Sequence, residues 1–245
     1  MRDYTVTFDF HNTIFNSEAW FQIEVFDLPG AWLRWRSRHY GYDVATDLIA
    51  EANLRYRRLR TAIHEHGHEL SAEGCLDIVL PQVGIKASDV DISEGVEAIM
   101  LATLEGIAPV DGVIDTIRDL EARGVRLGIV SSAVYHPFLI WSLDRHGLTG
   151  AFDAIVTSAS AGWYKSRPEI YWSALAELGA HPEGALHLGD SARFDVATGR
   201  RAGMKTVWYR REGAKTLEGD IGPDLTLTSL VGAAPSVVEL LERSG

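Results

Sequence analysis

Five residues of the sequence combine reactive side chains with positions at or shortly after β-rich runs: Asp9, Ser131, Lys165, Asp190 and Asp195. A carboxylate such as Asp9 can act as a nucleophile toward a phosphoryl group. Divalent cations such as Mg²⁺ prefer oxygen ligands, which carboxylates supply. A lysine and a serine hydroxyl can hold anionic oxygens and stabilise charge that develops during a reaction. Together, these side chains could carry out cation-assisted chemistry on a small anion.

The sequence predicts an α/β fold with a doubly wound parallel sheet, a Rossmann-like core, that brings these residues together. Strand-like runs and helical patterns alternate, most clearly from about Val110 onward, and this alternation is typical of right-handed β-α units. The expected strands cover residues 4–10, 125–132, 152–158, 184–190 and 204–210, with 225–230 as a possible last strand, and the expected helices cover 112–124, 137–147 and 167–179. Such sheets bind ligands at the carboxyl ends of their strands, so the reactive side chains should meet there.

The stretch between the first two core strands breaks this rhythm and is predicted to be helical. One helix pattern places Leu48, Ala52, Tyr56, Leu59 and Ile63 on one face. No Pro/Gly/Ser-rich linker separates this stretch from its surroundings, so it should pack as a cap. We therefore expect a Rossmann-like catalytic core at residues 1–14 and 108–245, with a helical cap domain at 15–107.

Composition narrows the classes of protein to consider. The chain has 245 residues and a formal charge of −11, which disfavours nucleic acid as a partner. Cys75 is the only cysteine, so an intramolecular disulfide and a cysteine-based zinc site are excluded. The sequence has no signal-peptide pattern and no apolar stretch of membrane-spanning length, and we expect a cytoplasmic protein that does not associate with membranes.

Four motifs in order make the sequence resemble the haloacid dehalogenase superfamily, whose members are mostly phosphatases with an aspartate nucleophile. The first motif is Asp9-Phe10-His11-Asn12-Thr13, and the second is the apolar run that ends at Ser131. The third is Lys165 ahead of a helix, and the fourth is the complete Gly189-Asp190 to Asp195 pattern. The resemblance covers nearly the whole chain.

This resemblance implies Mg²⁺-dependent hydrolysis of a small phosphorylated metabolite, a phosphomonoester, through a phospho-aspartate on Asp9. The metal ligands would be Asp9, Asp190, the backbone carbonyl of His11 and Asp195, the last either directly or through a water. Lys165 and the Ser131 hydroxyl would hold the transferring phosphoryl group. The neighbouring Ser132 either binds substrate phosphate or caps the helix that follows.

His11 departs from the family pattern, because typical phosphatases carry a second aspartate at this position. An imidazole can both donate and accept a proton, and its ordinary pKa of about 6.5 is close to neutrality. We therefore expect His11 to act as the general acid and base, with a titratable group near neutral pH.

The altered position leaves other reactions open. A phosphotransferase or mutase results if water attack is slow and an alcohol acceptor takes the phosphoryl group. Phosphonate or carbon–halogen hydrolysis is also open. Tyr171 stands where the family's dehalogenases carry a tyrosine, but phosphatases carry Phe or Tyr there as a packing residue, and Asp190 argues against a metal-free dehalogenase. A binding protein without turnover is a further alternative. The oligomeric state is left open.

Two further patterns have competing explanations. Residues 64–68 match the zinc-protease pattern HExxH, but Gly67 should end the helix and keep the histidines apart, so we reject a catalytic zinc site. Aromatic and arginine residues of the cap either recognise the leaving group or form the cap's interior and its wet surface. These residues are Trp20, Phe21, Phe26, Trp32 and Trp35, with Arg34, Arg36, Arg38, Arg55, Arg57, Arg58 and Arg60.

Overall fold

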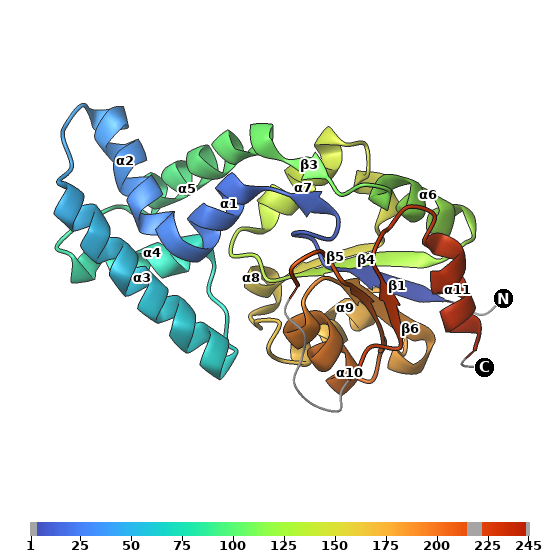
Figure 1. Ribbon diagram of the computed structural model, residues 1–245. Coiled ribbons are helices and arrows are strands. Elements are labelled where there is room, and N and C mark those ends of the chain that lie inside the picture. Colours follow the sequence, from blue (N-terminus) through green and yellow to red (C-terminus); the bar gives the residue numbers. More distant parts are fainter. Residues whose placement is uncertain (1–3, 215–221, 244–245) are drawn as a thin grey trace.

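A six-stranded parallel sheet forms the core of the computed structural model, which describes residues 4–214 and 222–243 (Figure 1). Its strands, in spatial order, are β5 (Ala154–Thr157), β4 (Arg126–Ser131), β1 (Thr5–Phe8), β6 (Ala185–Gly189), β7 (Lys205–Tyr209) and β8 (Leu225–Leu227). Every neighbouring pair is parallel. The sequence prediction of a Rossmann-like α/β core is confirmed, including the possible last strand.

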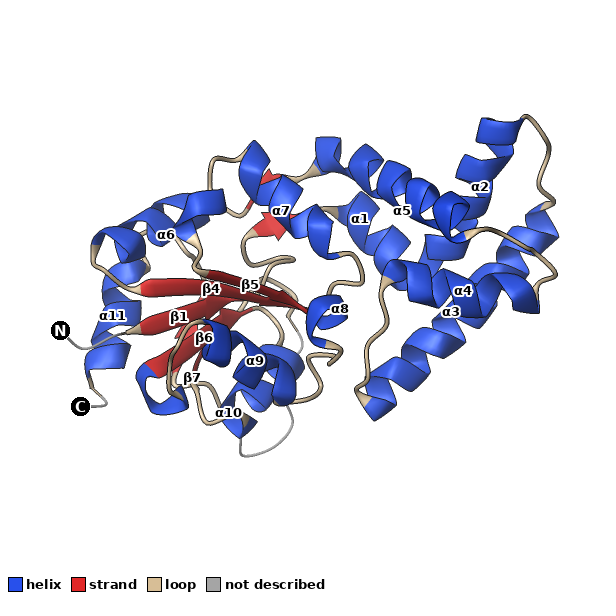
Figure 2. Ribbon diagram, turned by 180° about the vertical axis from the view of Figure 1, so that it is seen from behind, coloured by secondary structure: helices blue, strands red, loops and turns tan. Residues whose placement is uncertain are grey.

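Helices cover both faces of this sheet (Figure 2). Strand residues alternate between the faces: Ile129 packs into the cluster that includes α6, α7 and α11, whereas Val130 packs against α9. The core helices are α6 (Val113–Ala122), α7 (His136–Arg145), α8 (Ser158–Ala161), α9 (Glu169–Glu177), α10 (Gly199–Arg201) and α11 (Ala234–Glu242). Burial on both faces explains why the strands read as continuous apolar runs.

A bundle of helices lies beside the core and fills the stretch between β1 and β4 (Figure 1). Its helices are α1 (Glu18–Gln22), α2 (Leu28–Tyr40), α3 (Thr46–His66), α4 (Ala72–Gln82) and α5 (Asp89–Thr103), with a π-helical turn at Ile23–Asp27. The chain enters and leaves the bundle through an antiparallel pair, β2 (Phe15–Asn16) with β3 (Ala108–Pro109). We propose on this basis that the cap domain spans residues 15–107.

Hydrogen bonds tie the cap to the core, and a buried ion pair within the cap orients one of their acceptors. The backbone N–H of Tyr164 donates to the Gly67 carbonyl at 2.9 Å, and Ala72 donates to Val134 at 2.8 Å. Glu69 pairs with Arg60 of α3 and also accepts a hydrogen bond from Ser158 Oγ at 2.8 Å. These contacts hold the cap's α3–α4 segment against the carboxyl ends of the core strands.

The end of α3 agrees with the rejection of a zinc-protease motif. Gly67 has a φ of 80°, a left-handed conformation that ends the helix after His66, as predicted. His64 packs on Tyr164 with ring centroids 4.3 Å apart, while His68 packs on Trp163 at 4.5 Å. Neither histidine belongs to the single cluster of metal-ligating side chains found among the described residues.

Within residues 4–214 and 222–243, no helix is both long and apolar enough to cross a membrane. The cytoplasmic location stays a prediction.

Candidate active site

Asp9 lies immediately beyond β1, where a tight turn fixes its backbone. The turn closes through hydrogen bonds from the N–H groups of Ile14 and Phe15 to the carbonyl of Phe10, and Asn12 adopts a left-handed φ of 66°. Asparagine tolerates this conformation better than most residues, which suits it to the position. Thr13, the last residue of the motif, donates its hydroxyl to Asp9 Oδ2 at 3.1 Å. The turn thus orients one oxygen of Asp9 and leaves the other for a cation.

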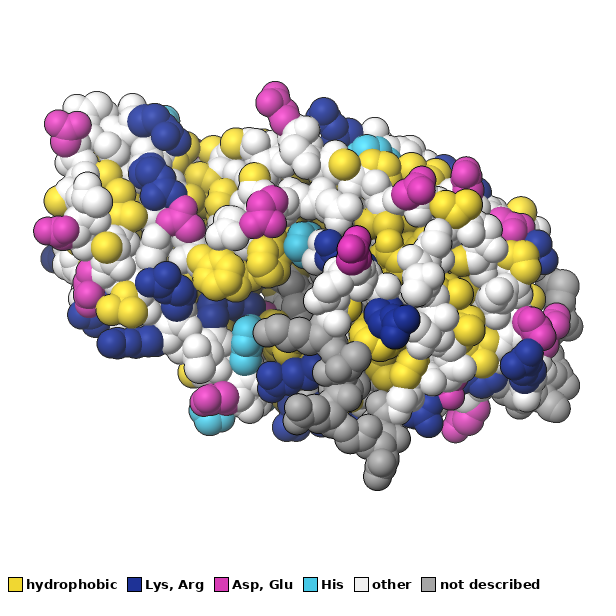
Figure 3. All heavy atoms as spheres, in the orientation of Figure 1, with side chains coloured by type: hydrophobic (Ala, Val, Ile, Leu, Met, Phe, Trp, Pro, Cys, Tyr) yellow, Lys and Arg dark blue, Asp and Glu magenta, His cyan; other side chains and the backbone are white. Residues whose placement is uncertain are grey.

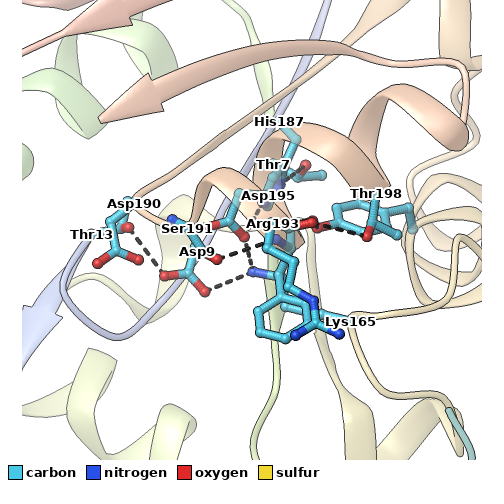
Figure 4. Close-up of polar contacts among 12 residues, drawn as sticks. Thr7, Asp9, Thr13, Lys165, His187, Asp190, Ser191, Arg193, Asp195 and Thr198 are labelled. Carbon is cyan, nitrogen blue, oxygen red and sulfur yellow. Dashed lines mark hydrogen bonds and ion pairs between the residues drawn. The ribbon is translucent and has the colours of Figure 1, made fainter. Parts of the chain in front are cut away.

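Lys165 supplies that cation and joins two carboxylates (Figure 4). Its Nζ donates to Asp9 Oδ1 at 2.7 Å and also pairs with Asp195 Oδ1. Burial would lower the pKa of Lys165, but Asp195 and Asp9 outweigh burial and raise this pKa well above its usual value. Burial raises the pKa of Asp9 to about 7, although Lys165 opposes the shift. The ammonium group is therefore charged, and Asp9 depends on nearby positive charge to ionise.

A chain of hydrogen bonds orients Asp195 from behind. Its Oδ1 contacts His187 Nε2 at 3.1 Å, and His187 Nδ1 contacts Thr7 Oγ1 at 2.8 Å. Its Oδ2 accepts from the backbone N–H of Ser191 at 2.7 Å. Burial would raise the pKa of Asp195, but Lys165 and His187 hold it below its usual range. Asp195 is thus an anion fixed at both oxygens.

Asp9, Asp190 and Asp195 form a cluster that fits a hard cation. One carboxylate oxygen from each lies within 4.8 Å of the others. Burial raises the pKa of Asp190 to about 6, with Asp195 adding to the shift and Arg211 opposing it from 3.3 Å. Several buried carboxylates that share two nearby cations carry excess negative charge, and an all-oxygen set of this kind suits Mg²⁺. The cluster therefore fits the metal that the sequence analysis expected.

The other predicted residues lie around the same pocket, which has a volume of about 300 Å³. Ser131, at the end of β4, and Ser132 both line it together with Asp9 and Lys165. Ser132 is too far from α7 to cap it, because that helix begins at His136 and its N-cap is Tyr135. The capping alternative for Ser132 is therefore wrong.

His11 lines the pocket too, but its electrostatic setting differs from the expectation. Its ring stacks on Phe21 with centroids 4.7 Å apart and an interplanar angle of 7°. Burial lowers the pKa of His11 to about 4, and Arg211 adds to the shift. This low pKa departs from the expected titration near neutrality and favours a neutral imidazole at pH 7. A neutral imidazole accepts a proton readily and can donate one as an imidazolium only after it has been protonated.

The pocket also contains residues that the sequence analysis did not assign to the site. Glu24, His64, Tyr164 and Phe194 line it, and Arg60 does so while paired to Glu69. The cap aromatics divide between the pocket and the interior of the cap. Trp20 and Phe21 line the pocket, whereas Trp32 is buried in the cap. The sequence could not identify these cap residues, because a helix face that lines a pocket has the same residue spacing as a helix face that packs on a core.

Comparison with known proteins relates this arrangement to one family. A sequence model described as haloacid dehalogenase-like hydrolase matches residues 64–209. A glyceraldehyde 3-phosphate phosphatase of Methanopyrus kandleri is 30% identical over 174 residues, 71% of this chain and 72% of that protein. An (S)-2-haloacid dehalogenase of Pseudomonas sp. strain YL is 27% identical over 199 residues, 80% of this chain and 81% of that protein.

Solved structures share the fold. A 2-haloacid dehalogenase from Pseudomonas syringae pv. Tomato aligns with a TM-score of 0.71 and 20% identity, covering 99% of this chain and 100% of that chain. A HAD phosphatase from Thermococcus onnurineus aligns with a TM-score of 0.63 and 21% identity, covering 96% and 97%. At these identities the likeness concerns the fold alone, but the family match spans more than half of the chain and includes its lysine and fourth motifs. The chain belongs to the haloacid dehalogenase-like hydrolases.

Proposed function

We propose that this protein hydrolyses a small phosphomonoester in two steps through a phospho-aspartate on Asp9. The observation that carries the proposal is the buried carboxylate cluster around one ammonium group, with Lys165 Nζ 2.7 Å from Asp9 Oδ1 and oxygens of Asp190 and Asp195 close by. A phosphoryl group carries its negative charge on several oxygens, so its transfer to a carboxylate needs such compensation. Relatives named as phosphatases support the same reaction class.

Mg²⁺ is the proposed cofactor, held by Asp9, Asp190, the backbone carbonyl of His11 and Asp195. When bound, it would offset the repulsion between the Asp9 carboxylate and the anionic phosphoryl group. Arg211 already pairs with Asp190 at 3.3 Å. Asp9 and Asp190 both have a raised pKa although each lies near a cation. A further positive charge would therefore stabilise the ionised form of both carboxylates.

The chain's own residues would divide the remaining work. Asp9 attacks the phosphorus atom and the alcohol departs, so that the P–O bond to the alcohol breaks as the P–O bond to Asp9 forms. Lys165 and the Ser131 hydroxyl hold the phosphoryl oxygens, with Ser132 as a further contact. In the second step a water attacks the phosphorus of phospho-Asp9 and releases phosphate.

We propose His11 as the group that exchanges protons with the leaving alcohol and with the attacking water. The basis is its place two residues after Asp9 on the wall of the same pocket. Because its imidazole is neutral, the activation of water is the better supported half of this role. His11→Ala should lower steady-state turnover by about a hundredfold. A burst of released alcohol followed by slow turnover would assign the loss to the second step, whereas unchanged turnover would remove His11 from the mechanism.

Carbon–halogen hydrolysis is the second candidate, because one similar protein, 27% identical, is named as a haloacid dehalogenase. The same Asp9 carboxylate could attack a carbon that bears a halogen. This reaction needs no cation at Asp190, so Asp190 separates the two proposals. The remaining alternatives, a phosphotransferase and a silent binding protein, differ from the hydrolase in whether free phosphate appears.

The test measures phosphate release from para-nitrophenyl phosphate and chloride release from 2-chloropropanoate, each with Mg²⁺ or with a chelator. We expect phosphate release that requires Mg²⁺ and is lost in Asp9→Asn. Chloride release that persists with the chelator would favour the dehalogenase instead. Phosphoryl transfer to an added alcohol without free phosphate would favour the transferase, and no reaction at all would favour the binding protein.

A further inference from the structure

Glu24 is a buried carboxyl group in the cap that faces the same pocket as Asp9. It belongs to the π-helical turn at Ile23–Asp27, and only 2% of its surface is exposed. Its Oε1 accepts a hydrogen bond from the backbone N–H of Val134 at 3.2 Å. Its Oε2 is fully buried and has no hydrogen-bond partner among the residues that the structure describes. A polar atom that is buried without a hydrogen-bond partner costs free energy, and a donor from a bound ligand would remove that cost.

The nearest opposite charge is already engaged elsewhere. Arg60 also lines the pocket, but two of its guanidinium nitrogens pair with Glu69, one of them at 3.2 Å. Burial raises the pKa of Glu24 well above its usual range, and Arg60 opposes this only in part. Glu24 therefore lacks a direct ion-pair partner within the described residues, unlike Asp9, Asp190 and Asp195 of the same pocket.

Aromatic rings also line the pocket that contains Glu24 and Asp9. Trp20, Phe21, Tyr164 and Phe194 line the pocket, whose volume is about 300 Å³. Such a wall favours an apolar or aromatic body, while the polar groups of the pocket fix its orientation.

We propose that Glu24 determines specificity by accepting, at Oε2, a hydrogen bond from an amino or hydroxyl group on the leaving group of the substrate. The substrate class is then a phosphomonoester that joins an apolar body to a hydrogen-bond donor. This inference rests on the proposed function for the identity of the phosphoryl end. The pocket's preference for a donor beside Glu24 stands on the contacts of Glu24 itself.

Three esters of matched shape test the proposal: para-ethylphenyl phosphate, para-(hydroxymethyl)phenyl phosphate and para-(aminomethyl)phenyl phosphate. Their dissociation constants are measured by titration calorimetry on Asp9→Asn with Mg²⁺, so that no turnover interferes. We expect both donor esters to bind at least about tenfold more tightly than the ethyl ester. When Glu24→Leu is added, the three esters should bind about equally well. When Glu94→Gln is added instead, the preference for the donor esters should be unchanged, because Glu94 is an exposed carboxylate on α5.

The ratio between esters separates recognition from a structural role. If Glu24 has only a structural role through its contact with Val134, Glu24→Leu should weaken the binding of all three esters alike. The ratio of their dissociation constants would then be unchanged, and that result would overturn the proposal. Equal binding of the three esters, a preference for the ethyl ester, or no binding of any ester would overturn it as well. If Glu24→Leu does not fold, Glu24→Gln decides, because its amide oxygen can still accept a hydrogen bond and should keep the preference for the hydroxyl ester. Loss of that preference in Glu24→Gln would contradict the proposal.

Failure of the proposed function gives a different result. Phosphate release from the ethyl ester by the native protein tests hydrolysis, independently of Glu24. Selective binding without phosphate release would reject the hydrolase and keep the Glu24 inference. Phosphate release at the same kcat/KM from all three esters would keep the hydrolase and reject the inference.

Discussion

Lys165 is a buried cation between two carboxylates, and its removal would leave both without a direct compensating charge. The side chain is 3% exposed and contacts Asp9 and Asp195. Desolvated charges are tolerated only when they are paired, so the stability of the fold and the chemistry of the site depend on the same ammonium group. This coupling makes Lys165 a strong test of the site's electrostatics.

We predict that Lys165→Met destabilises the protein by about 3 kcal/mol in the absence of Mg²⁺ and lowers kcat/KM by at least about a hundredfold. The stability change follows from two buried carboxylates losing their partner, and urea unfolding measures it. Lys86→Met is the matched control, because Lys86 is exposed. Equal unfolding midpoints for the two variants would contradict the ion-pair account.

The reactive residues could be predicted because each combines a chemical type with a position at a strand end. Asp9, Ser131, Lys165 and Asp190 all stood in that context, and the structure places all of them at one pocket. Glu24 could not be predicted in this way. A glutamate in a helical segment is usually exposed, and only the packing of the cap against Val134 buries it. The low pKa of His11 likewise depends on packing against Phe21 that no local pattern encodes.

Strand β6 ends in a residue that leaves room for Asp195. A Cβ atom on Gly189 would lie 2.3 Å from the carboxylate of Asp195, far inside contact distance. The strand end and the helical turn that carries Asp195 therefore approach more closely than any other residue at position 189 permits. The short spacing of the fourth motif reflects this approach.

We predict that Gly189→Ala displaces Asp195 and lowers kcat/KM by at least about a hundredfold, because small displacements of catalytic groups are costly. Steady-state kinetics with an aryl phosphate measures the loss. Gly150→Ala provides the control, since a Cβ there meets nothing within 4 Å. Wild-type activity in Gly189→Ala would show that Asp195 does not need its present position.

Helix α4 buries the only cysteine of the chain in the cap. Burial raises the pKa of Cys75 to about 12, so the reactive thiolate is scarce at pH 8. We predict that a disulfide reagent labels the native protein slowly at pH 8, and that labelling becomes fast once urea unfolds the cap and restores the thiol's ordinary pKa. Rapid labelling of the folded protein would mean that α4 is not packed as the structure has it.

Strands of the repeating β-α pattern could be predicted, whereas the two-residue strands β2 and β3 could not. Strand β4 and helix α3 have enough residues to display their periods, and Gly67 marks the end of α3. The β2–β3 pair at the base of the cap consists of two-residue strands. Strands this short have no detectable hydrophobic period, so the sequence did not predict them. The π-helical turn at Ile23–Asp27 was likewise unforeseen, because its pattern resembles an ordinary helix.

The whole molecule is acidic, yet its pocket must receive an anion. The formal charge is −11, so the average field repels phosphate esters. Lys165 and Arg211 counter this field within the site, and Figure 3 shows Lys, Arg and His side chains where the cap meets the core. A bound divalent cation would complete this local reversal of charge.

We predict that Mg²⁺ raises the melting temperature, because an ion that binds only the folded cluster stabilises the fold. At about a hundred times its dissociation constant, the gain amounts to about 2.7 kcal/mol. Thermal unfolding with Mg²⁺, compared with NaCl at equal ionic strength, measures the effect. The gain should be lost in Asp190→Asn, and an equal gain in that variant would place the ion elsewhere.

If Asp9 carries the phosphoryl group, the phosphorylated protein should be captured when the reaction is stopped while the intermediate is present. The protein with Mg²⁺ and para-nitrophenyl phosphate is quenched in acid within a turnover, and its peptides are analysed by mass spectrometry. We predict one phosphoryl group, located on Asp9 and missing when chelator replaces Mg²⁺. Phosphate release with no phosphorylated peptide at any quench time, or a phosphoryl group on Ser131 instead, would contradict it.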